Sequence, residues 1–479
     1  MRGEQIMDNF VSIQLHKTGQ PLYLELAHEI ERLLPSLPAD ERLWTVRALA
    51  KQAGVNTSTV VAAYRYLEEC GLVYTKPGSG TYRMPREASL LDSFEDTPGR
   101  DSYSRAAAQG GMINLTGNSL SPDFFPVEEF KRAVSRVLDR DGGTAFSYQD
   151  SEGYFPLREQ VRVFVRDHYG IACSTQDILL TSGAQQAVDI VAKSLLAPSD
   201  VVIAENPSYV GMKSLFTMYG AKILGVPLEE DGVNVDMIEA YAKRYNPKLV
   251  YTMPVYQTPT GVTLSPDKRR RLLALARQQD FYIVEDDLYS DVSLKGERIP
   301  PLKSEDTDGR VLYVKSFSKL LMPGVRVGFL IVPERLRSRV SGAKYATDIV
   351  GAGFLQRALC EFIEQGALRT HLDALTGRYR ALYAAGRERV RAFRRYGVTV
   401  RMPGGGYGFW LTLPEQMNDQ DAYEFCKARG VVIAPGRSFY LSPMLGDTRH
   451  IRLGFCSSDR VQEGYAVLEA YFAQHAPSM

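Results

Sequence analysis

The sequence predicts a small helical unit at the N-terminus, followed by a large α/β unit built on a mainly parallel sheet. Three observations support this fold class. The 479 residues exceed the usual size of one domain. Residues 86–111 are polar and small, with helix breakers and no apolar periodicity, which is typical of a linker. Beyond them, short apolar runs alternate with stretches at helical spacing, as in parallel α/β folds.

Composition limits the classes of function. The chain has 57 Lys and Arg against 56 Asp and Glu, so its net charge of +1 predicts no acidic partner for the protein as a whole. A local basic patch can still bind nucleic acid. Five scattered cysteines and six scattered histidines predict reduced thiols and no metal site. No long uncharged apolar run or signal-type start occurs, so we expect a cytoplasmic protein without a membrane partner.

The first unit, residues 1–85, reads as a winged helix-turn-helix. Residues 21–34, 45–54 and 55–71 each have the apolar spacing of a helix, and the last two are joined at Gly54. The following "LVYTKPGSGTYRM" predicts two short strands around Pro-Gly-Ser-Gly, the arrangement of a wing. This pattern favours DNA binding.

Charge leaves an alternative open for this unit. Seven basic and seven acidic residues lie between positions 21 and 85, which is also compatible with a three-helix packing domain that makes no DNA contact. The basic residues nevertheless cluster from the turn onward, which suits phosphate contacts. They are Arg47, Lys51, Arg65, Lys76 and Arg83.

The large unit, residues 112–479, contains the strand and helix candidates in alternation. The apolar runs predicted as strands are residues 177–183, 200–207, 248–254, 281–287, 310–316 and 327–332. Helical spacing is clear in residues 184–196 and 265–279. Ligands of such folds bind at the carboxyl ends of strands, and the candidate functional residues of this chain follow those ends.

Three acids end one of these strands, in "VEDDLYSDV" at 284–292. Clustered carboxylates are costly to bury unless a cation is near. One interpretation is a magnesium site, although no phosphate-binding Gly-Lys loop accompanies it. Another is a carboxylate that keeps a heterocyclic nitrogen protonated. In a third, Glu285 and Asp287 cap a helix or face solvent, and only one acid matters.

Two further groups point to a cofactor. The strand-turn-helix "LLTSGAQQAVDIV" places free helix N-terminal amides where an anion can bind. In "VKSFSKLLMPGVRVGF", Lys319 lies within an apolar run with two serines and Arg326, a bidentate partner for phosphate. A lysine that can form a Schiff base, an acid for a ring nitrogen and a phosphate cup together indicate pyridoxal 5'-phosphate.

The large unit resembles the fold-type I aminotransferases, nearest to the kynurenine and α-aminoadipate branch. The matching motifs include "YQDSEGYFPLR", "ENPSYVG", "EDDLY", "SFSKLLMPGVRVG", "GGGYGFW" and "RLGF". The first unit resembles the GntR-type winged helix, although "LWTVR" replaces the usual Leu-Pro-Ser-x-Arg and Asn56-Thr57 replaces a Ser-Arg pair. Together they resemble the MocR-type regulators. The resemblance implies a fold-type I domain with a smaller C-terminal α/β subdomain.

The resemblance also implies roles for single residues. Lys319 matches the catalytic lysine that holds the cofactor, and Arg452 matches the arginine that binds a substrate carboxylate. Tyr148 matches a tyrosine that reaches the phosphate of the other subunit, so a homodimer with shared sites is expected. Thr258 stands where the family has an asparagine near the ring oxygen. The other expected cofactor contacts are Asp286 at the ring nitrogen, Tyr289 near the ring oxygen, Tyr209 stacked on the ring, and Ala184, Gln185, Ser316, Ser318 and Arg326 around the phosphate.

Three functions fit these predictions. The first is a transcriptional regulator that binds double-stranded DNA and senses an amino acid, an amine or a vitamin B6 compound through the cofactor. The second is an active aminotransferase with an appended winged helix, which the replacement by Thr258 disfavours. The third is a DNA-binding protein whose large unit only dimerises. The residues expected to contact DNA are Arg47, Asn56, Thr57, Ser58, Thr59, Arg65 and Lys76.

Overall fold

The computed structural model describes residues 22–34, 37, 41–69, 72–76, 80–83, 111–117, 120–441 and 448–476. The chain divides into two compact units, Met1–Asp96 and Thr97–Met479. The predicted linker at 86–111 lies outside the described residues except for its last residue. Within the described ranges, no helix combines the length and the apolar character needed to cross a membrane.

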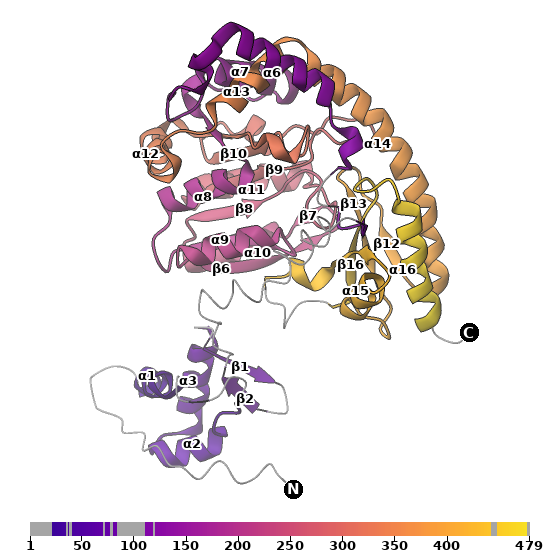
Figure 1. Ribbon diagram of the computed structural model, residues 1–479. Helices are drawn as coiled ribbons and strands as arrows, with labels where there is room; N and C mark the ends of the chain where they lie inside the picture. Colours follow the sequence, from indigo (N-terminus) through magenta and orange to yellow (C-terminus); the bar gives the residue numbers. More distant parts are fainter. Residues whose placement is uncertain are drawn as a thin grey trace. The chain divides into compact units, whose positions relative to one another are not determined.

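The described residues of the first unit form three helices and a two-stranded sheet (Figure 1). They are α1 (Leu22–Leu33), α2 (Val46–Ala53), α3 (Thr57–Glu69), β1 (Val73–Lys76) and β2 (Gly80–Arg83). Thr45 caps α2, because its side-chain oxygen accepts a hydrogen bond from the Ala48 amide at 3.3 Å. Gly54 ends α2 with φ of 65°, a left-handed conformation that glycine adopts without strain. Leu26, Leu49 and Val60 bring the three helices into one core.

The large unit is built on a mainly parallel sheet, as the sequence predicts. The strand order is β4-β11-β10-β9-β8-β5-β6-β7. The strands are β4 (Ile178–Thr181), β5 (Val201–Asn206), β6 (Lys222–Glu229), β7 (Gly232–Val233), β8 (Leu249–Thr252), β9 (Tyr282–Asp287), β10 (Val311–Ser316) and β11 (Gly328–Ile331). The five central strands from β10 to β6 run parallel, whereas β11 is antiparallel to both β10 and β4.

Helices cover both faces of this sheet (Figure 1). They are α6 (Val127–Asp141), α7 (Phe155–Tyr169), α8 (Ala184–Leu195), α9 (Val210–Met218), α10 (Val235–Tyr245), α11 (Pro266–Gln278), α12 (Arg337–Asp348) and α13 (Gly353–Glu364). Val284 of β9 lies in the apolar cluster that includes α8 and α9, whereas Ile283 lies in the cluster of α10 and α11. Because strand residues alternate between faces, Asp286 and Asp287 at the end of β9 point to opposite sides of the sheet.

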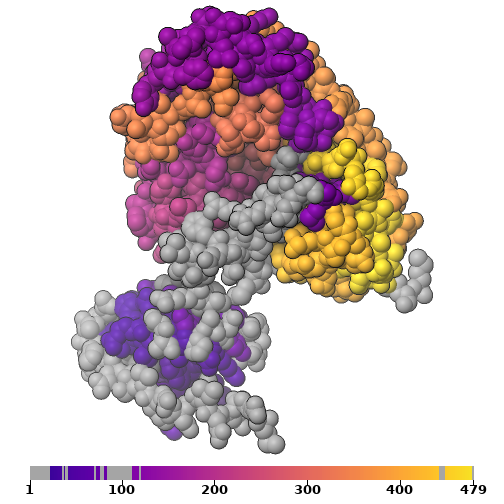
Figure 2. Space-filling model, in the orientation of Figure 1, coloured from indigo at the N-terminus to yellow at the C-terminus, as the bar shows by residue number. Residues whose placement is uncertain are grey.

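A smaller α/β region follows, as expected from the resemblance. Its sheet has the order β12-β13-β16-β15, and β14 pairs with β3. The elements are β3 (Ile113–Asn114), α14 (Ala367–Ala392), β12 (Thr399–Arg401), β13 (Gly408–Thr412), α15 (Asp419–Lys427), β14 (Val431–Val432), β15 (Ala434–Pro435), β16 (His450–Gly454) and α16 (Val461–His475). The long helix α14, in orange, runs along the edge of the unit toward α16, in yellow (Figures 1 and 2).

Candidate functional site

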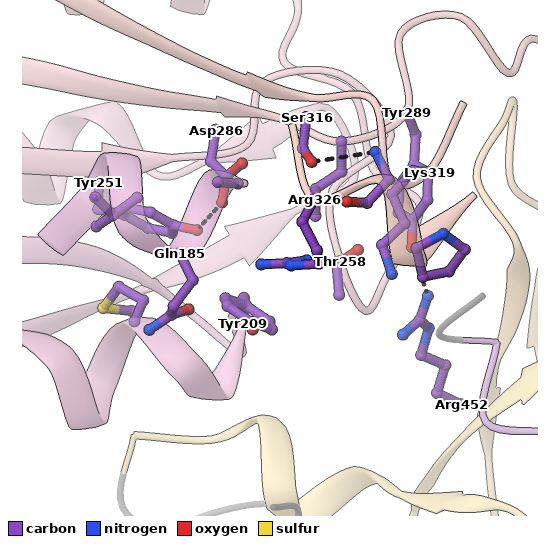
Figure 3. Close-up of a pocket in the computed structure, with 16 residues that line it drawn as sticks. Gln185, Tyr209, Tyr251, Thr258, Asp286, Tyr289, Ser316, Lys319, Arg326 and Arg452 are labelled. Carbon is purple, nitrogen blue, oxygen red and sulfur yellow. Dashed lines mark hydrogen bonds between the residues drawn. The ribbon is translucent and has the colours of Figure 1, made fainter. Parts of the chain in front are cut away.

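A cavity of about 250 Å³ lies at the carboxyl ends of the central strands. The strands β8, β9 and β10 end beside it, the first turn of α8 lines it, and β16 contributes from the smaller sheet (Figure 3). Its lining contains every residue predicted from the sequence to contact the cofactor or substrate except Tyr148. The lining residues are Ala184, Gln185, Val188, Tyr209, Met212, Tyr251, Thr258, Asp286, Leu288, Tyr289, Ser316, Ser318, Lys319, Pro323, Arg326 and Arg452.

Lys319 supplies the amine of this cavity. It lies in the turn that follows β10, and its side chain enters the cavity with partial access to solvent (Figure 3). Burial of the amine among protein atoms lowers the pKa of Lys319, and the positive charge of Arg452 lowers it further, against Tyr289 and Asp286, which raise it. A lowered pKa increases the fraction of neutral amine, which is the nucleophilic form.

Asp286 is the buried carboxylate of the cavity. One of its oxygens accepts a hydrogen bond from the Tyr251 hydroxyl at 2.5 Å, while Oδ1 has no hydrogen-bond partner among the described residues. Burial raises the pKa of Asp286 to about 6. An open oxygen on a desolvated carboxyl fits a protonated ring nitrogen, because that cation would supply the missing partner. The residues present therefore fit a pyridine-type cofactor.

The other two acids of the "EDD" cluster act elsewhere. Glu285 accepts hydrogen bonds from the amides of Leu302 and Lys303 at 2.6 and 2.7 Å, and Asp287 faces Lys315. The interpretation in which Glu285 caps a helical turn is thus in line with the structure. The interpretation in which these acids face solvent is wrong, because all three carboxylates are buried.

An anion cradle forms where β4 passes into α8. Gly183 precedes the helix with φ of 118°, and a β-carbon there would come within 3.0 Å of Nη2 of Arg326. Glycine therefore leaves room for the guanidinium, which donates to the Ser182 carbonyl. Ser316 accepts from the amide of Ser318 at 3.2 Å, and the Ser318 hydroxyl has no partner among the described residues. Free helix amides, two hydroxyls and a guanidinium suit a phosphate group.

Aromatic and polar side chains close the rest of the cavity. The ring of Tyr209 lies over Gly211, whose missing side chain admits it, because a β-carbon there would come within 2.6 Å of the ring. Thr258 is buried, and its hydroxyl has no partner among the described residues. Tyr209 thus offers a ring face, and Thr258 offers a hydroxyl where the family has an amide.

Arg452 brings a positive charge from the smaller sheet. Its side chain is 3 % exposed and comes from β16. Nη2 donates to the Gly117 carbonyl at 2.9 Å and to the Tyr289 hydroxyl at 3.1 Å. A buried guanidinium oriented in this way can bind a carboxylate with strong charge-assisted hydrogen bonds.

Tyr251 is the residue of this site that the sequence analysis missed. It lies next to the end of β8, in register with Val284 of the neighbouring β9. In the sequence it belongs to an apolar strand, where a tyrosine reads as core. The available signal was that Tyr251 lies near the carboxyl end of its strand. Two other strands of the sheet already carried predicted site residues at their carboxyl ends.

Tyr148 lies outside the cavity. Its side chain is 90 % exposed, and no other residue predicted for the cofactor site is placed away from the cavity. The expectation that it reaches the site of a second subunit stays a prediction.

The first unit exposes most of the residues predicted to contact DNA. Arg47 is exposed on α2, Asn56, Thr57 and Ser58 are exposed at the start of α3, and Thr59 is half-buried. Arg65 is exposed on α3 as well. The side chain of Lys76 is not among those that the structure describes. Arg83, which the charge pattern grouped with the basic residues of this unit, is buried.

An Arg47→Ala variant is expected to bind operator DNA more weakly across all sequences. Loss of one phosphate contact reduces the slope of log affinity against log salt concentration by about one. Fluorescence anisotropy at several salt concentrations would measure both effects. Arg32→Ala is the matched control, because Arg32 is a 75 % exposed arginine on α1. Equal affinity and slope in the two variants would remove Arg47 from the interface.

Comparisons with known proteins match both units. The family model of class I and II aminotransferases matches residues 111–468, and that of the gntR family of bacterial regulatory proteins matches residues 22–82. An aromatic-amino-acid aminotransferase of Thermococcus litoralis is 32% identical over 74% of this chain and 86% of its own. The probable rhizopine catabolism regulatory protein MocR of Rhizobium meliloti is 29% identical over 91% of this chain and 90% of its own. The structure of Pyrococcus horikoshii kynurenine aminotransferase superposes with a TM-score of 0.74 at 30% identity, covering 81% of this chain and 99% of that one.

Proposed function

Because the chain belongs to the class I and II aminotransferase family and carries a GntR-family DNA-binding domain at its N-terminus, we propose that it is a pyridoxal phosphate-dependent transcriptional regulator. The large unit senses an amino acid, an amine or a vitamin B6 compound. The observation that carries this proposal is a fully lined cofactor cavity in the same chain as a helix-turn-helix with an exposed helix start. Relatives of this two-part architecture are described as HTH-type transcriptional regulators.

In this proposal each group of the cavity has one task. When bound, pyridoxal phosphate supplies an electrophilic aldehyde carbon and an electron-withdrawing ring. Lys319 would hold the group at that carbon, and Asp286, held by Tyr251, would stabilise the proton on the ring nitrogen. Tyr209 would orient the ring by stacking, and Tyr289 and Thr258 would contact the ring oxygen. The residues that would hold the phosphate are Arg326, Ser316, Ser318 and the first residues of α8, Ala184 and Gln185.

Of these three classes of effector, we propose an amino acid, because Arg452 supplies a partner for a carboxylate. An amino acid in the cavity would place its amine beside Lys319, and Arg452 would offer a partner for its carboxylate. Movement of the smaller sheet, which carries Arg452, is the change that we expect to alter DNA binding.

We further propose that two copies share their sites. The exposed Tyr148 has no role within its own cavity, and Phe146 and Phe155 nearby in sequence are 66% and 55% exposed. These exposed apolar side chains favour a surface through which two copies associate. A homodimer also suits a winged helix, since two copies read two half-sites of DNA. DNA binding favours a location in the cytoplasm.

The second candidate is a working aminotransferase with an added DNA-binding domain. Retention of Lys319 and Arg452 and the similarity to the Thermococcus aminotransferase favour it. Thr258 counts against it, because a hydroxyl in place of the family's amide changes the contact to the ring oxygen. We therefore expect weak transamination or none.

One experiment separates the two candidates. The visible absorption of the purified protein would be recorded with candidate amines and amino acids, in parallel with its affinity for the promoter region of the neighbouring gene. A regulator shows spectral change and altered DNA binding without accumulation of a keto acid. Turnover to a keto acid by a protein that binds no DNA would support the enzyme instead.

An Arg452→Met variant is expected to lose the response to amino acids and to keep the response to simple amines. Loss of the charge-assisted hydrogen bonds to a carboxylate weakens the affinity for an amino acid by roughly 10- to 100-fold. Spectral titration with an amino acid and with the amine formed by its decarboxylation would measure the difference. Equal loss for both ligands would show that Arg452 does not bind the carboxylate.

A further inference from the structure

A second lysine of β10, Lys315, is buried behind the cavity. It is 1 % exposed, and its ammonium nitrogen lies 3.0 Å from Oδ2 of Asp287, 2.8 Å from Oδ2 of Asp291 and 3.0 Å from the Ser290 hydroxyl. The same nitrogen is 4.8 Å from the centre of the Tyr169 ring. One buried cation therefore joins two carboxylates, and we call these three residues the Lys315 triad.

Further hydrogen bonds hold the acids of the triad. The Tyr313 hydroxyl donates to Asp287 at 2.5 Å, and the Tyr169 hydroxyl donates to Asp291 at 2.6 Å. Burial alone would lower the pKa of Lys315, but the two acids raise it above its ordinary value. Burial would raise the pKa of Asp287, but Lys315 and the hydrogen bonds bring it below its ordinary value. Lys315 and Asp287 are therefore both charged at neutral pH.

The triad encloses a segment that lines the cavity. Asp287 and Asp291 flank Tyr289, and Asp286 directly precedes Asp287. Lys315 does not line the cavity, because it stands opposite Asp287 in the β9–β10 register and shares its face of the sheet. The ammonium thus links both ends of a turn whose middle residue, Tyr289, lines the cavity.

We propose that Lys315 is a positioning residue that fixes the turn from Asp287 to Asp291 and offsets the negative charge behind Asp286, so that Asp286 stays ionised against the cofactor. The inference rests on the cofactor site of the proposed function. The ionisable groups with the largest effects on Asp286 are Tyr251 and Lys319 on the cavity side and Asp287 and Lys315 on the other. Lys315 lowers the pKa of Asp286 and Asp287 raises it.

The proposal predicts shifts of opposite sign. Removal of the Lys315 charge favours the protonated form of every nearby group, so titration midpoints in the cavity move to higher pH. In the effective dielectric of a protein, removal of one unit charge from behind Asp286 moves the titration midpoint by about one pH unit. Removal of the Asp291 charge has the reverse effect and moves midpoints to lower pH.

The test uses the full chain loaded with pyridoxal phosphate and follows its visible absorption against pH. Lys315→Met should raise the midpoint by about one pH unit, and Asp291→Asn should lower it. Lys268→Met is the matched control and should leave the midpoint unchanged. Lys268 also contacts two carboxylates, those of Glu229 and Asp231, and its side chain is 12 % exposed, but it lies outside the cavity.

The outcomes separate the two claims. A wild-type chain without cofactor absorption overturns the proposed function. A wild-type midpoint that both variants leave in place, or move in the same direction, overturns the role of Lys315 alone. If Lys315→Met does not fold, Asp291→Asn decides by itself, because an unshifted midpoint in that variant overturns the proposal. A purely structural role would lower the unfolding temperature of these variants and leave the midpoint in place.

Discussion

A Lys319→Gln protein is expected to hold no covalently attached pyridoxal phosphate. The glutamine amide is not nucleophilic and cannot bind the aldehyde carbon, whereas burial and the Arg452 charge lower the pKa of the Lys319 amine and make it reactive. Visible absorption of the purified protein and mass spectrometry after borohydride reduction would measure the loss. We expect incorporation to fall to background, with DNA affinity retained in the absence of effector.

The matched control for Lys319→Gln is Lys268→Gln, which removes a lysine outside the cavity and should leave incorporation unchanged. Peptide mapping of the reduced wild-type protein adds a second check, because β10 and its following turn carry two lysines. The two acidic neighbours of Lys315 raise the pKa of its amine and keep it protonated, so Lys315 is a poor nucleophile. A label on Lys315, or full labelling of Lys319→Gln, would contradict the assignment.

The residues of the cavity were predictable where chemistry interrupts an apolar pattern. Lys319 and Arg326 stand out because charged groups follow a strand that is otherwise apolar, and Asp286 stands out among three acids at a strand end. The fold class followed from the alternation of apolar runs with helical spacing, which the packing of helices on both faces of the sheet requires. The antiparallel β11 was not predictable, since its apolar run, 327–332, has the same pattern as a parallel strand.

Groups that act through space were harder to find. Tyr251 and Asp286 are 35 residues apart, and only the β8–β9 pairing brings them together. Lys315 meets Asp287 and Asp291 through the pairing of β9 with β10. In the sequence the two lysines of "VKSFSK" look alike. Their different roles depend on position, because Lys315 lies on β10 opposite Asp287, whereas Lys319 lies in the turn that follows β10 and lines the cavity.

An Asp286→Asn variant is expected to stabilise the cofactor-free protein and to weaken cofactor binding. Burial raises the pKa of Asp286 from 3.8 to about 6 in the folded protein. A carboxyl whose pKa is raised on folding binds its proton more tightly in the folded state, so stability falls as pH rises from about 4 to 6 and then levels off. The ionised form therefore destabilises the folded protein above pH 6, by about 2–3 kcal/mol as an order of magnitude.

Asparagine has no charge to desolvate, so the variant should gain this free energy of unfolding at pH 8 and nearly none of it at pH 4. Urea unfolding of cofactor-free protein at the two pH values would measure the gain, and Asp267→Asn, at a carboxylate whose side chain is 85 % exposed, is the control. With pyridoxal phosphate bound, the wild type should be more stable than the variant, because only the carboxylate stabilises a protonated ring nitrogen. A variant that is no more stable than wild type at pH 8 would contradict the cost assigned to the buried charge. A variant that binds the cofactor as tightly as wild type would show that Asp286 is not the partner of the ring nitrogen, because loss of its charge would then have no effect on binding.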